Sequence, residues 1–204
     1  MVSVEIECTP YIKMVTRDEF LDESSRENVH FGDDMEEGNY SKWVDKYPDH
    51  IIAIFGAYLD CGGGDQVTKD GLKYFKERGI DLNSRSNAYW LEDNRGHCTP
   101  LGLACSKRNS NLIRILIDEG AKVNVLCYKN DTYIEYLLDY LFVGHVYGCR
   151  NPEGVEECLK ILEDAGVKKI INKSTFEKDC RYYVKFSQYM KEFIEKCEVV
   201  EDES

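Results

Sequence analysis

The chain has 204 residues, of which 43% are hydrophobic and 31% are charged, and its formal net charge is −12 at pH 7. This composition can form a buried core and excludes a disordered or collagen-like chain. The longest apolar run, His50 to Leu59, has about half the length of a membrane-spanning helix, and the first residues lack the basic start of a secretory signal.

The first 47 residues are predicted to form an acidic segment with capping helices at 17–21 and 40–47. The run from Asp18 to Glu37 holds nine acidic residues and one arginine. Such a run forms either a surface for a basic partner or a solvated face.

Three later segments share one pattern, in which apolar residues at helical spacing are followed by a glycine and by a short extended stretch that ends in asparagine. The segments are Gly71–Asn83, Asn111–Asn124 and Glu157–Asn172. The spacing predicts an amphipathic helix in each. In Asn111–Asn124, the stripe is formed by Leu112, Ile113, Leu116 and Ile117. The glycines at 79, 120 and 166 are predicted to end the three helices in the left-handed conformation.

Another helix is predicted just before the second segment, since Thr99 can cap it and Pro100 suits its first turn. Thr99–Ala104 (TPLGLA) followed by Gly120–Asn124 (GAKVN) resembles the ankyrin repeat, with Gly102 where the family has histidine. Residues 132–138 take the place of the same helix without its proline, and residues 50–53 do so in the first unit.

The resemblance implies an all-α fold, an ankyrin-type helical solenoid with non-standard helical caps. About three irregular repeats would occupy residues 48–172. Residues 173–204 would supply a capping helix and an acidic, solvated tail, because end units need a polar outer face. The residues predicted to face inward from this cap are Phe186, Tyr189, Met190, Phe193 and Ile194.

The spacing of the units predicts two insertions. The asparagines that end the units are 41 and 48 residues apart, against a family period of about 33. The extra residues are expected at 84–94, on the finger side of the stack, and at 142–154, on the opposite edge.

The first insertion is the predicted partner-binding site. It places aromatic and acidic side chains on a surface loop, and tyrosine and tryptophan are frequent anchors of protein interfaces. The alternative is that its rings fold back onto the first helix pair. The predicted partner-binding residues are Tyr89, Trp90, Leu91, Glu92, Asp93 and Arg95, together with Tyr128, Lys129 and Asp131 on the next finger tip.

No residue pattern typical of a catalytic, metal or cofactor site is found. The glycines at 62–64 precede Thr68 and Lys69, which is the wrong order for a phosphate-binding loop. His97 with Cys98, and His145 with Cys149, lack the second close pair of a zinc site. Neither a metal, nor a cofactor, nor a small-molecule substrate is therefore expected.

The nine cysteines include no CxxC pair, so a disulfide framework is not indicated. Cys105 and Cys158 fall on apolar faces of predicted helices and are predicted to be reduced core thiols. Reduced thiols indicate a cytoplasmic protein.

The net negative charge argues against nucleic-acid binding, which requires a basic face, and favours a basic protein partner. The resemblance implies binding through the finger tips and the concave helix face. The sequence therefore predicts a soluble, monomeric inhibitor or adaptor, such as a toxin-neutralising immunity protein or a pathogen or viral modulator of a host pathway. The alternative is an enzyme or regulatory subunit with a pocket near the 142–154 insertion.

Overall fold

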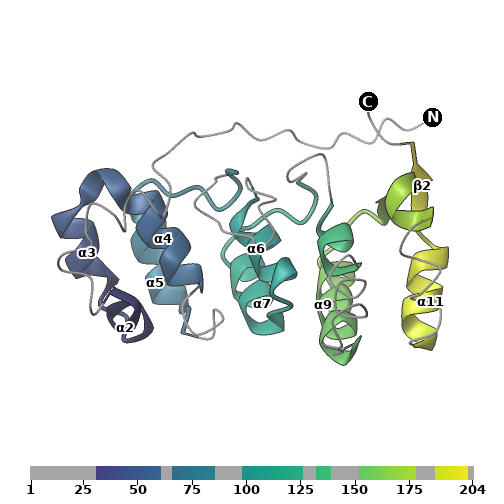
Figure 1. The fold of residues 1–204 in the computed structure, drawn as a ribbon, viewed down its shortest axis with the longest axis horizontal. Helices are drawn as coiled ribbons and strands as arrows, with labels where there is room; N and C mark the ends of the chain where they lie inside the picture. Colours follow the sequence, from purple (N-terminus) through teal and green to yellow (C-terminus); the bar gives the residue numbers. More distant parts are fainter. Residues whose placement is uncertain are drawn as a thin grey trace.

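The computed structural model describes residues 31–60, 66–85, 98–125, 132–138, 152–177 and 187–201. These residues are mostly helical, as the sequence predicts. Figure 1 shows the helices side by side in a row, from α2 (Phe31–Glu36) and α3 (Tyr40–Lys46) at one end to α11 (Gln188–Glu195) at the other. The buried apolar side chains form one cluster that extends along this row.

The first helix pair is α4 (Ile51–Asp60) and α5 (Lys69–Glu77), preceded by a short 3₁₀ turn, η2 (Pro48–His50). Residues 52–59 are all buried, because this apolar helix is covered on several sides. Helix α5 is amphipathic and buries Leu72 and Phe75. Its N-terminus is capped by Thr68, whose side chain accepts a hydrogen bond from the N–H of Gly71 at 3.1 Å.

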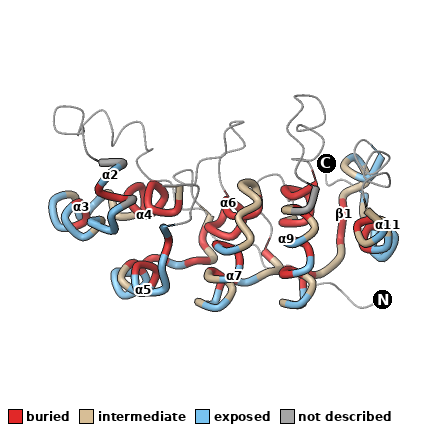
Figure 2. Tube along the Cα trace, turned by 90° about the horizontal axis from the view of Figure 1, so that it is seen from below, coloured by how far each residue is buried: buried red, intermediate tan, exposed pale blue. Residues whose placement is uncertain are grey.

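The second pair is α6 (Pro100–Ser106) and α7 (Ser110–Asp118). The predicted cap of α6 is confirmed, since the N–H of Gly102 donates to Thr99 Oγ1 at 3.1 Å. In α7, Leu112, Ile113 and Leu116 are fully buried, whereas Ile117 is half-buried. Figure 2 shows α4 and α6 in one row of helices, and α5 and α7 in a second row.

The third pair consists of a helix at 133–138 and α9 (Pro152–Asp164). Since α9 begins at Pro152, the predicted insertion at 142–154 extends too far, and its last three residues are helical. Proline at the first position of a helix explains this start, because the missing N–H is not needed there and φ is already helical.

The three predicted helix ends share one hydrogen-bond pattern, and their C-cap glycines are confirmed. After α7, the N–H of Gly120 donates to Ile117 O at 3.0 Å and the N–H of Ala121 to Leu116 O at 2.9 Å. The equivalent pair of bonds follows α5 and α9. The φ angle is 100° at Gly120, and 92° and 82° at the glycines of the other two ends. This pattern is the Schellman motif, which glycine adopts without a steric cost.

The C-terminal part differs from the all-α prediction because it contains two short strands. β1 (Ile170–Asn172) pairs in parallel with β2 (Glu198–Val200), with Ile171 opposite Val199. The predicted solvated tail therefore begins with a strand. Two consecutive valines suit a strand, and the edge of β1 supplies the partner backbone.

The residues predicted to face inward from the C-terminal helix lie in α11 where the structure describes them. Met190, Phe193 and Ile194 are buried against the apolar cluster, and Tyr189 is half-buried. Residue 186 and the capping helix predicted at 17–21 lie outside the described ranges.

Candidate protein-binding surface

All nine predicted partner-binding residues lie outside the described ranges, in residues 86–97 and 126–131. The structure does describe the residues that bracket both segments. The first segment leaves after Arg85 and returns at Cys98, and the second leaves after Val125 and returns at Thr132. The position of these four residues decides where the two segments are attached.

Asparagine side chains at the end of one unit form hydrogen bonds with the backbone of the turn that follows the second helix of the next unit. Asn83 Oδ1 accepts a hydrogen bond from the N–H of Lys122 at 2.7 Å, and Asn124 Oδ1 accepts one from the N–H of Lys168 at 2.7 Å. Asn124 also donates through Nδ2 to Gly166 O at 3.2 Å. We call the residues 81–85, 121–125 and 167–172 the turn edge. The asparagine that ends each of the first two units therefore fixes the turn of the next unit.

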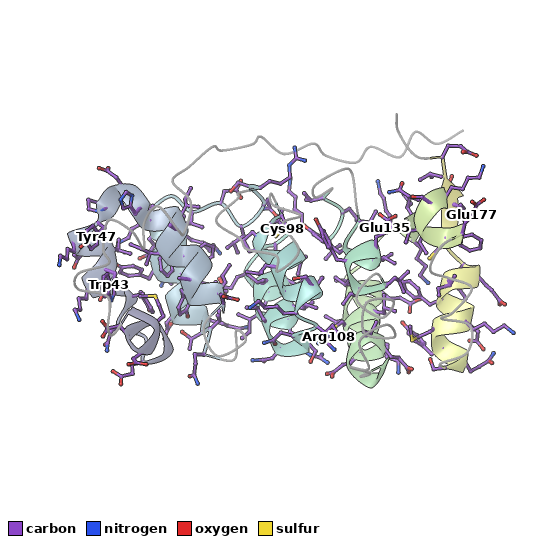
Figure 3. All side chains as sticks on the ribbon, viewed as in Figure 1. Trp43, Tyr47, Cys98, Arg108, Glu135 and Glu177 are labelled. Carbon is purple, nitrogen blue, oxygen red and sulfur yellow. The ribbon has the colours of Figure 1, made fainter. Side chains whose placement is uncertain are left out.

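The returning ends of both segments lie on the same side of the molecule. Figure 3 shows Cys98 and Glu135 toward the upper edge of the row, whereas Arg108, between α6 and α7, lies toward the lower edge. Both predicted loop segments are therefore attached along one edge of the helical row.

The buried carboxylate of Glu135 holds the C-terminal end of this edge. Glu135 is 2% exposed. Its Oε1 accepts from the N–H of Asn172 at 2.8 Å, and its Oε2 accepts from the N–H of Thr132 at 2.7 Å and from Asn172 Nδ2 at 3.3 Å. Burial raises the pKa of Glu135, and the hydrogen bonds from Thr132 and Asn172 oppose this rise.

Glu135 thereby links a helix start to a strand. The N–H of Glu135 donates to Thr132 Oγ1 at 3.3 Å, which completes a capping box with the bond from Thr132 N–H to the carboxylate. Thr132 Oγ1 also donates to Ile170 O at 3.3 Å. β1 is therefore held between β2 on one side and the start of the 133–138 helix on the other.

Tyr133 connects the second and third units. It occupies the place where the repeat pattern has proline, and its Oη lies 2.8 Å from Thr99 Oγ1, the cap of α6. Both side chains are buried. The departure from the repeat pattern therefore adds a buried hydrogen bond between neighbouring helix starts.

A small cavity lies at the turn edge between the second and third units. Its volume is about 20 Å³, enough for one water molecule and far below the several hundred Å³ of a typical ligand pocket. It is lined by Val123, Asn124, Val125, Thr132, Tyr133, Val167, Lys168 and Ile170. This cavity is too small for a small-molecule substrate.

The first helices of the three pairs offer little surface to a partner. Residues 52–59, 100–105 and 133–138 are all buried, as the continuous red segments of α4 and α6 in Figure 2 show. The concave helix face that the resemblance implies is therefore not a free surface along these residues. Exposed side chains occur on the second helices, for example at Lys73 and Arg114, and at the turn edge at Asp81 and Lys122.

Part of the acidic run from 18 to 37 is described, and one of its carboxylates has a structural role. Asp34 is 9% exposed and accepts hydrogen bonds from Lys42 Nζ and Trp43 Nε1, each at 2.9 Å. The Lys42 ammonium lowers the pKa of Asp34. Asp34 therefore joins α2 to α3 and is not available for steering a partner.

Within the described ranges, Cys98, Cys105, Cys158 and Cys197 form no disulfide, and the first three are fully buried, as predicted for Cys105 and Cys158. Burial raises the pKa of the Cys158 thiol to about 12. Within the described ranges, no three His, Cys, Asp or Glu side chains lie close enough to hold a metal ion. His97, His145 and Cys149 lie outside these ranges.

Comparison with known protein families, known proteins and solved structures gives no significant match for this chain. None of the helices in the described part of the chain is both long and apolar enough to cross a membrane.

The residues that hold the turn edge in place, among them Thr132 and Glu135, are not among the predicted site residues. The T-x-x-E spacing of Thr132 and Glu135 is a capping-box signal and could have identified Glu135. The pairing of β1 with β2 has a weaker signal, since a three-residue apolar stretch occurs equally in helices and strands.

Proposed function

We propose that this chain is a protein-binding ankyrin-type solenoid, which acts as a monomeric cytoplasmic inhibitor or adaptor and has no catalytic site. The partner is a more basic protein. It contacts the segments 86–97 and 126–131, with Tyr89, Trp90 and Leu91 as anchors. The observation that carries the proposal is the turn edge, where Asn83 and Asn124 fix the attachment of both segments.

A fixed attachment favours binding because it lowers the entropy lost when a loop meets its partner. The side-by-side arrangement of the helices (Figure 1) and the shared pattern of their ends support the solenoid. In such an array each unit is held by its neighbours, and function depends on the surface of the array.

The charge of the chain supports a basic partner. The net charge is −12, and Glu92, Asp93 and Asp131 lie in the two proposed contact segments. Opposite charges on two proteins accelerate association, and salt weakens this effect. A toxin neutralised by an immunity protein, or a host protein bound by a pathogen or viral protein, fits this description.

The test is an affinity capture of the partner from native lysate, with the wild type and the Tyr89→Ala/Trp90→Ala variant as baits. We expect the wild type to retain one basic protein and the variant to lose it by about tenfold or more, since interface aromatics are frequent hot spots. Raising the salt concentration should also lower capture by the wild type.

Circular dichroism and thermal unfolding must show that the variant is folded. Lys191→Ala is the control. Lys191 lies in α11, far from both proposed contact segments in the sequence, so this variant should capture the partner as well as the wild type. Equal capture by the Tyr89→Ala/Trp90→Ala variant would remove the loop from the proposal, and the lack of any captured partner would contradict the proposed function.

A further inference from the structure

We draw no further inference here: the strongest candidate, the outer edge of β2 with the exposed apolar side chains of Phe176 and Val199, carries no proposal because acidic and basic side chains are mixed in the stretches around it and nothing in the described part of the structure shows what covers it.

Discussion

At the scale of single residues, the buried Glu135 side chain joins the start of the 133–138 helix to β1. Its two carboxylate oxygens accept hydrogen bonds from the N–H groups of Thr132 and Asn172 and from the side-chain amide of Asn172, and the Thr175 side chain adds a further hydrogen bond. A buried carboxylate with this set of donors is satisfied as an anion, even though burial raises its pKa. A side chain that must donate cannot replace it.

Glu135→Gln is therefore expected to lower the free energy of unfolding by about 1–3 kcal/mol, because its NH₂ group would face a backbone N–H and leave a buried donor unsatisfied. Urea unfolding at neutral pH measures the change. Glu157→Gln makes the same chemical change on the exposed face of α9, where Glu157 pairs with Arg114 at 3.0 Å, and should cost less than about 1 kcal/mol. Equal losses in the two variants would show that the Glu135 contacts contribute no special stability.

At the scale of elements, a single carboxylate joins α9 to α11. Glu163 forms an ion pair with Lys169 and accepts a hydrogen bond from Tyr189 Oη at 2.7 Å. The Lys169 ammonium lowers the pKa of Glu163, with a further contribution from the Tyr189 hydroxyl. Since Lys169 also lies over the ring of Phe193, at 5.0 Å from its centroid, these contacts fix the last helix against the row.

The lowered pKa of Glu163 predicts how this contact depends on pH. Its contribution is present above the ordinary carboxyl pKa of 4.5 and is lost as the pH falls through the lower value of the folded state. Glu163→Gln should therefore reduce the free energy of unfolding by about 0.5–1 kcal/mol at neutral pH, with a difference that vanishes on acidification.

Urea unfolding of the wild type and the variant from about pH 7 to about pH 3 measures this difference. Glu195→Gln, on the exposed face of α11, is the matched control. A difference that stays constant over the whole range would assign the effect of Glu163→Gln to packing and not to its charge.

At the scale of the whole molecule, the sequence predicts those features that depend on local chemistry. The capping of α6 by Thr99 and the C-cap at Gly120 follow from side-chain and backbone preferences within a few residues. The burial of Leu112 and Leu116 follows from helical periodicity.

Features that depend on long-range pairing could not be predicted in the same way. β2 forms by pairing with β1, in a register that places Glu198 opposite Ile170, nearly thirty residues earlier in the chain. The residue types at 198–200 do not by themselves predict this pairing. The contact of Tyr133 with Thr99 depends likewise on how two helix starts meet. For the predicted partner-binding residues, the structure describes only the attachment points, so their role stays a prediction.

The row of helices also predicts how the molecule opens. An inner element of a linear array has a neighbour on both sides, whereas the last one has a neighbour on one side only, so the end should open more readily than the centre. Three cysteines report on this difference: Cys105 in α6 and Cys158 in α9 are fully buried, and Cys197 follows α11 and is half-buried. Burial raises the pKa of both Cys158 and Cys197 to about 12, so neither forms much thiolate at neutral pH without local opening.

Alkylation of the native protein, followed by peptide mapping with mass spectrometry, should therefore modify Cys197 at least about tenfold faster than Cys105 or Cys158. Adding low concentrations of urea should accelerate the two inner sites as global unfolding becomes accessible, because their exposure requires loss of neighbouring contacts. The same reaction after complete unfolding is the control, since all three thiols should then react at similar rates. Equal rates at Cys197 and Cys105 in the native protein would mean that the row opens as one cooperative unit, with the contacts of Glu163 and β2 coupling its end to its centre.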